Sequence, residues 1–193
     1  MAILMSAIMS QPHHITAQTL ESILQERSAF KNNPQIKIGG TSKIGLLTKF
    51  GVSLGGLAIN PALNKVYVTN PSLNTVSVLD SNSGNTTKNI LVGIGPSHIA
   101  VDSLTNKVYV ANFRDNTVSV IDAVNDKKEA KDIHVGIGPT AIAVDSLTNK
   151  VYVANYISHT VSVIDGFTNT NIKNITVGDS PTYIDFGIIG NTI

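Results

Sequence analysis

Two sets of polar side chains recur along this chain and could carry chemistry. Three aspartates each close a Thr-Val-Ser-Val tract, and three asparagines each close a tract that begins Lys-Val-Tyr-Val. They are Asp80, Asp122, Asp165, Asn70, Asn112 and Asn155. A ring of carboxylates could act in acid–base catalysis, but a side chain that every copy carries is typical of a scaffold. Because Asx side chains bond the backbone of the turns that they enter, we expect all six to cap turns.

The five histidines do not have the spacing of a metal-ligand set. His13 and His14 are adjacent, whereas His98, His134 and His159 fall on different predicted strands and turns. The tract GIGP contains a G-x-G, but the helix and lysine of a phosphate loop do not follow it. The chain has no cysteine, so it offers no thiolate nucleophile. The sequence therefore predicts no catalytic residue, no metal and no cofactor.

The recurring tracts belong to a block of about 42 residues that is present three times from Gly51 onward. The tract KVYVTN or KVYVAN begins at Lys65, Lys107 and Lys150, and the tetrapeptide TVSV follows each at a fixed distance. A period of about 40–50 residues built from short β-rich segments is typical of the four-stranded blade of a β-propeller. We predict blades over about 51–93, 94–136 and 137–178.

Each copy predicts four strands, A to D, joined by short turns. In the second copy these are His98–Asp102, Lys107–Asn112, Thr117–Asp122 and Asp132–Val135. Strands A and B are nearly all apolar, whereas strand C alternates valine with threonine or serine. This gradient favours a blade whose inner strands are covered on both faces and whose outer strands meet more water.

The repeat pattern extends past both ends of the three complete copies. Leu46–Phe50 stands where strand D of a preceding blade would lie, and Gly178–Phe186 repeats the strand-A segment of a following blade. Apolar residues at helical spacing over Thr16–Arg27 predict a short helix. We therefore predict a non-repeat N-terminal extension with a short helix over 1–43. An all-β partial propeller follows over 44–193, with three complete four-stranded repeats and partial blades at both ends.

Three blades alone do not close a propeller, which generally needs at least four. An open array leaves apolar sheet faces uncovered at its ends. Three explanations stay open at this point. The chain is a truncated piece of a longer propeller, or it closes by self-association, or residues 1–43 cap an open face.

The words VYVTN, VYVAN, TVSVID and VGIGP, at constant spacing over about Gly51–Phe186, resemble the YVTN family of β-propeller repeats. That family occurs in archaeal and bacterial surface-layer proteins and in YncE-like secreted proteins. The resemblance implies a propeller, often seven-bladed, that is usually outside the cell membrane and usually without catalysis. It therefore favours a secreted or cell-surface location for this chain.

The residues that differ between copies are the better candidates for a binding surface. In a propeller the D–A connections and the B–C turns share one face, which we call the top face. The strand-A position reads His98, Ala141 and Tyr183 in successive copies, and the B–C turns read PSL, FRD and YIS. Aromatic residues and arginine are favoured at interface centres. The candidate binding face therefore comprises His98, Phe113, Arg114, Tyr156, His159 and Tyr183, although ordinary variation between loops would give the same pattern.

Composition narrows the class of partner. The formal net charge is +1 and the lysines are scattered, which argues against nucleic acid, and no apolar run is long enough to span a membrane. The function favoured is a non-catalytic scaffold or binding module for protein or glycan. The alternative is a propeller enzyme of the lactonase or lyase type with its site at the channel mouth, where His98 is the one well-placed candidate.

Overall fold

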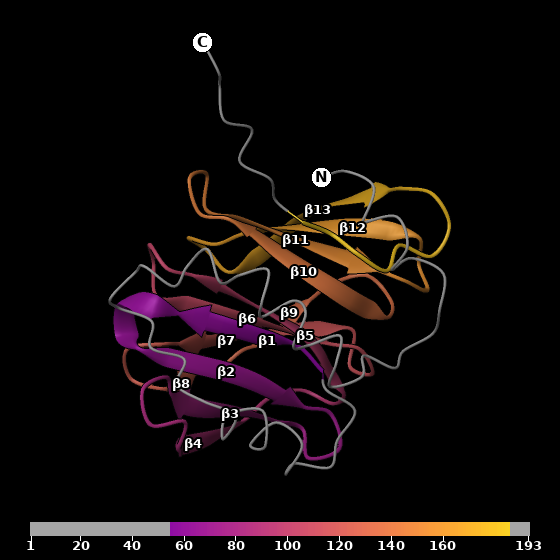
Figure 1. Ribbon diagram of the computed structural model, residues 1–193. Coiled ribbons are helices and arrows are strands. Elements are labelled where there is room, and N and C mark those ends of the chain that lie inside the picture. The colour runs from indigo at the N-terminus through magenta and orange to yellow at the C-terminus, as the bar shows by residue number, and fades with distance from the viewer. Residues whose placement is uncertain (1–54, 186–193) are drawn as a thin grey trace, which may run out of the picture.

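The computed structural model describes residues 55–185, which form three antiparallel sheets of one repeating design (Figure 1). The helix predicted over Thr16–Arg27 and the strand predicted over Leu46–Phe50 lie outside the described residues. Each sheet coincides with one predicted blade, so the expected all-β blade architecture is confirmed. Within residues 55–185, no helix is long and apolar enough to cross a membrane.

Each blade is a meander in which every strand pairs with the next one along the chain. The first blade consists of β1 (Leu57–Asn60), β2 (Lys65–Asn70), β3 (Thr75–Asp80) and β4 (Thr86–Leu91), with a short 3-10 turn, η2 (Pro61–Leu63), after β1. The second consists of β5 (Pro96–Asp102), β6 (Lys107–Asn112), β7 (Thr117–Asp122), β8 (Lys127–Lys128) and β9 (Ile133–His134). The third consists of β10 (Pro139–Asp145), β11 (Lys150–Asn155), β12 (Thr160–Asp165) and β13 (Thr170–Thr176).

The outer strand of the second blade differs from the prediction of one strand over Asp132–Val135. Instead, β8 and β9 pair separately with the two ends of β7. Residues 129–132 leave the ladder between them, and Lys128 Nζ lies 2.9 Å from the carboxylate of Asp132. Residues 126–132 carry a run of charged side chains. The break in the ladder leaves these side chains in contact with water and lets two of them form the local ion pair.

The partial blade predicted over Gly178–Phe186 is not a strand in its described part, residues 178–185. No strand among residues 55–185 pairs with this segment, which is irregular. It nevertheless follows the path of a next strand A. Thr140 Oγ1 donates to the carbonyl of Pro181 at 3.0 Å, as Ser97 Oγ donates to the carbonyl of Pro139 at 2.8 Å.

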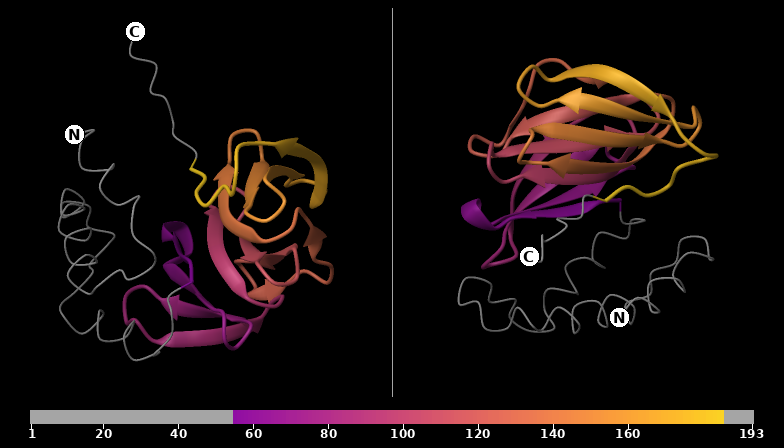
Figure 2. Two further views of the ribbon diagram at one scale, coloured as in Figure 1. Left: turned by 90° about the vertical axis from the view of Figure 1, so that its right-hand side faces the viewer. Right: turned by 90° about the horizontal axis from the view of Figure 1, so that it is seen from above.

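The hydrophobic core lies between the blades, which stack face against face (Figure 2). One cluster joins Tyr67 and Val78 of the first blade to Val108 and Val110 of the second. The other joins Tyr109 of the second blade to residues of the third. The second blade is thus covered on both faces, which explains why its inner strands are nearly all apolar.

The outward faces of the first and third blades are less covered. On β1, Leu57 and Ile59 remain 47% and 39% exposed. On the third blade, Tyr152 occupies the place of the fully buried Tyr67 and Tyr109 but is only partly buried. The same repeated strand is therefore buried to a different extent in each blade, according to which of its faces a neighbouring sheet covers.

Candidate binding face

The three repeated aspartates cap turns, as the sequence predicts. In Asp80, Asp122 and Asp165, Oδ1 accepts hydrogen bonds from the backbone N–H groups two and three residues further on. A hydrogen bond from the Asn125 side chain is the main reason that the pKa of Asp122 is lowered. The bond from the Lys150 ammonium is the main reason that the pKa of Asp165 falls to about 2. These carboxylates are therefore engaged in hydrogen bonds within the scaffold.

The three repeated asparagines do not cap turns, so that prediction is wrong for them. Nδ2 of Asn112 donates to Thr117 Oγ1 at 3.1 Å and to Ser119 Oγ at 2.9 Å on the neighbouring strand. Asn70 and Asn155 make the same pair of bonds in their own blades. All three are buried, because each side chain turns inward across the strand pair instead of out into the turn.

A conserved geometry, which we call the top clamp, ties each B–C turn to the connection that enters the next blade. The last residue of the turn has a positive φ of 54–57°, and its side chain accepts a backbone N–H from that connection. The pairs are Asn74–Gly95, Asn116–Gly138 and His159–Ser180, at 3.0, 2.9 and 2.9 Å. His159 therefore does in the third copy what asparagine does in the other two, by using Nδ1 as the acceptor.

A second contact, the bottom clamp, links the blades on the opposite face. Nζ of Lys65 donates to the carbonyl of Ala123 at 2.7 Å and to the carboxylate of Asp126 at 2.9 Å. Lys107 makes the corresponding contacts with the C–D turn of the third blade. Lys150 pairs instead with the aspartate opposite it in its own blade, at 2.7 Å. The two clamps hold the loops of the top face on a rigid frame.

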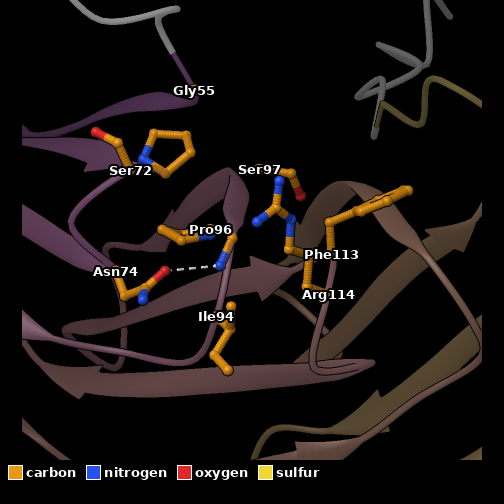
Figure 3. Close-up of a pocket in the computed structure, with 10 residues that line it drawn as sticks. Gly55, Ser72, Asn74, Ile94, Pro96, Ser97, Phe113 and Arg114 are labelled. Atoms are coloured by element: carbon orange, nitrogen blue, oxygen red, sulfur yellow. Dashed lines mark hydrogen bonds between the residues drawn. The ribbon is translucent and has the colours of Figure 1, made fainter.

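The top face is hollowed between the first and second blades by a cavity of about 660 Å³. Its walls come from the B–C turns of both blades and from the connection between them (Figure 3). The lining residues are Gly55, Pro71, Ser72, Asn74, Ile94, Gly95, Pro96, Ser97, Phe113 and Arg114. Most of them are apolar, so the cavity presents an apolar wall with a few polar groups.

Arg114 supplies the positive charge of this cavity. Figure 3 shows its guanidinium rising from the turn toward Ser97. The stem of Arg114 lies against Gly95, where an added Cβ would stand 3.1 Å from Arg114 Cγ and the backbone has a φ of +67°. Glycine at that position therefore lets the arginine stem pack closely. The adjacent Asp115 accepts the N–H of Ile94 at 2.5 Å, so its carboxylate is engaged in holding the wall.

The cavity exists at this interface because the repeat copies differ in size at two turn positions. The first turn has Pro71 and Ser72 where the second has Phe113 and Arg114. Between the second and third blades, Phe113 and Ile157 crowd Gly138, with Cε2 and Cγ1 at 3.2 and 2.9 Å from the position of an added Cβ. At the second interface Phe113 takes the place that Pro71 has at the first, and its larger ring lies beside Gly138.

The structure separates the six residues predicted for the binding face. Phe113 and Arg114 lie together in the cavity wall. Tyr156 and Tyr183 are exposed elsewhere on the third blade and the segment after it, at 40% and 67%, and His159 makes the top clamp.

The remaining predicted residue, His98, lies on β5 and is partly buried. Burial lowers its pKa, and its Nδ1 has no hydrogen-bond partner in the described part of the chain.

Sequence reasoning missed Pro71, Ser72, Ile94 and Pro96 as members of the site, because it ranked turn residues by aromatic and charged character. The signal that could have found them is the loss of side-chain volume at 71–72 relative to the aligned turn of the second copy. Among residues 55–185, no group of three or more His, Cys, Asp or Glu side chains is placed to hold a metal ion.

Comparison with known proteins identifies the fold. No protein-family model matches the chain, and no curated protein matches it. Hydrazine synthase of Kuenenia stuttgartiensis is similar over 67% of this chain and 38% of its own, with 23% identity and a TM-score of 0.63. Apo AztD from Citrobacter koseri is similar over 63% of this chain and 35% of its own, with 19% identity and a TM-score of 0.54. A further crystal structure of Citrobacter koseri AztD gives 19% identity and a TM-score of 0.53, over 63% of this chain and 34% of its own.

The chain thus spans well under half the length of the structures that it resembles. At these identities the likeness concerns the fold alone. Together with the three stacked meanders, it establishes a β-propeller-like fold for residues 55–185.

Proposed function

We propose that this chain is a non-catalytic binding module that recognises a protein or a glycan through the loops of its top face. The observation that carries the proposal is that the clamps are alike in the repeats, whereas the residues of the B–C turns differ. The clamps and turn caps recur from copy to copy, whereas the turn residues beside them change and open a cavity at one interface. Variable loops on a rigid frame are the usual arrangement of a recognition surface.

The size and lining of the cavity support a ligand site. Its volume of about 660 Å³ lies within the range of about 300–1,000 Å³ that is common for ligand pockets. Phe113 offers a broad apolar surface and Arg114 a planar donor group. These are the residue types that dominate the centres of interfaces. The site therefore combines an anchor for apolar groups with one orienting charge.

We also propose a secreted or cell-surface location, on the ground of the resemblance to the YVTN repeat. Low charge and the absence of cysteine are compatible with that location. It is tested by expressing the full-length gene product with a C-terminal epitope and treating intact cells with a protease. Loss of the epitope from intact cells, or its recovery in the medium, is the expected result, whereas full protection until lysis would contradict the proposal.

The test of binding uses the purified chain on a glycan array and on a peptide array in parallel. The double variant F113A/R114A removes the two large side chains of the cavity wall. Leu104→Ala is the matched control, since Leu104 is 69% exposed on the A–B turn of the same blade, on the opposite face. We expect the double variant to lose the bound spots and the control to keep them. Binding that survives in the double variant, or no binding on either array, would refute the proposal.

A further inference from the structure

We infer that the cavity between the first and second blades takes a short peptide segment in which a carboxylate stands beside an aromatic or aliphatic side chain. This inference rests on the proposed function and specifies the ligand of the same site. Three features carry it, namely a guanidinium without a partner among the described residues, an apolar wall, and a scarcity of other polar groups that could bind a ligand.

The guanidinium of Arg114 favours a ligand with an anionic group. Arg114 is exposed, makes no hydrogen bond or ion pair through its side chain with the described residues, and has its stem beside Gly95. The nearest acid in the turn, Asp115, is taken up by the N–H of Ile94. A planar guanidinium binds a carboxylate through two parallel hydrogen bonds.

The wall beside it calls for an apolar side chain. Pro71, Ile94, Pro96 and Phe113 line the space, and Ile94 remains 48% exposed. Filling the cavity would remove this apolar surface from water, which is the main driving force of association. A carboxylate alone would leave the wall uncovered, so the ligand must bring both groups within one or two residues of each other.

The small number of further polar partners favours a peptide over a glycan. A sugar ring presents a hydroxyl on nearly every carbon, and each one needs a partner when it is buried. The carbonyl oxygen of Asn74 already accepts the N–H of Gly95, and the hydroxyl of Ser97 is bonded to the carbonyls of Ala111 and Pro139. Of the lining side chains other than Arg114, this leaves Ser72 Oγ and Asn74 Nδ2 for a ligand. A peptide can bury an apolar side chain here and leave its own backbone at the open mouth.

The chain supplies its own matched variants. Arg114→Ile places at this turn the residue that the third copy has there, Ile157, so it removes the charge with a side chain that the blade accepts. Arg114→Lys keeps the charge but not the planar fork. Pro71→Phe places in the first turn the residue of the second copy, whose ring packs beside the glycine equivalent to Gly95. It should therefore fill the cavity.

The experiment uses an array of short glycine-flanked peptides that display every pair of amino acids at two central positions. An array of acidic and neutral glycans is probed beside it. We expect the chain to retain pairs of Asp or Glu with Phe, Tyr, Trp, Leu or Ile over their amide counterparts by about ten- to hundredfold, which is the range for a charge-assisted hydrogen bond. Arg114→Ile should abolish that preference, Arg114→Lys should weaken it, and Pro71→Phe should abolish binding altogether.

Each other outcome overturns the inference in a distinguishable way. Peptides bound without preference for an acid, and unaffected by Arg114→Ile, would refute the carboxylate and leave the proposed function standing. Acidic glycans bound in place of peptides would refute the ligand class alone. Failure to bind either array refutes both the inference and the proposed function. A thermal melt of each variant confirms that the blades are folded before the arrays are read.

Discussion

The same tyrosine in three copies provides a test of how the blades stabilise one another. Tyr67 and Tyr109 are fully buried against the next blade, whereas Tyr152 is only partly buried. We predict that Tyr→Ala costs much more stability at the first two positions than at the third. Because the residue and its strand are alike in all three, intrinsic β propensity cancels from the comparison.

The magnitude follows from burial. A buried tyrosine removes roughly 200 Å² from water, which at about 25 cal/mol per Å² is about 5 kcal/mol. The hydroxyls of Tyr67 and Tyr109 have no hydrogen-bond partner in the described part of the chain, and burying such a group costs about 1–3 kcal/mol. The net loss on Tyr→Ala is therefore about 2–4 kcal/mol at each of these positions. At Tyr152, whose side chain is only partly buried, we expect about 1–2 kcal/mol.

The assay is urea denaturation of the full chain, followed by circular dichroism at two protein concentrations. Tyr109→Phe is the companion variant, because it removes only the unpartnered hydroxyl and should leave stability unchanged or raise it by about 1 kcal/mol. An equal cost at Tyr152 and Tyr109 would refute the reasoning, since it would mean that the face of the third blade is covered in solution. Dependence of the Tyr152 effect on protein concentration would assign that cover to a second copy.

Three further predictions concern the clamps and the turn carboxylates. His159→Ala should lower the free energy of unfolding by about 0.5–1.5 kcal/mol through loss of the bond from Ser180, whereas His159→Asn should not, since asparagine does this work in the other copies; equal urea midpoints for the two variants would contradict this role. Lys107→Ala should cost about 1–2 kcal/mol, because its ammonium bonds to Asn169 and to a backbone carbonyl of the next blade, and the loss is read from the thermal midpoint. The pKa of Asp165 is lowered from 3.8 to about 2, so its contribution is present above about pH 4 and is lost as the pH falls toward 2. Urea midpoints measured between pH 5 and pH 2 should show this loss in the wild type, and Asp165→Asn should flatten it; an identical pH profile in the variant would exclude Asp165 as its source.

Several parts of the site were open to prediction because they depend on local chemistry. The turn caps at Asp80, Asp122 and Asp165 involve atoms only two or three residues apart, so the sequence indicates them directly. The same holds for the placement of the variable turns on one face, which follows from strand order alone. Phe113 and Arg114 were found in this way, and both lie in the cavity wall.

Other parts were beyond the sequence because they depend on contacts between distant segments. An asparagine at the end of a strand can cap the turn or reach across to the next strand, and burial selects the second arrangement for Asn112. The clamp made by His159 becomes visible only when the copies are aligned and their hydrogen bonds are known. The role of the small residues Pro71 and Ser72 became visible only in the structure, where they line the cavity.

The amino-acid sequence by itself determined the blades of this protein. Its apolar alternation, its strand motifs and its turn residues act over a few residues, and they recur in each copy. The tertiary structure alone decided which faces of the blades are covered and where the top face is hollowed. Those properties arise from packing between residues about forty positions apart, such as Tyr67 and Val108, which belong to one core cluster. Identical repeat segments are therefore buried to different extents, and the cavity lies where two copies of one turn differ in side-chain volume.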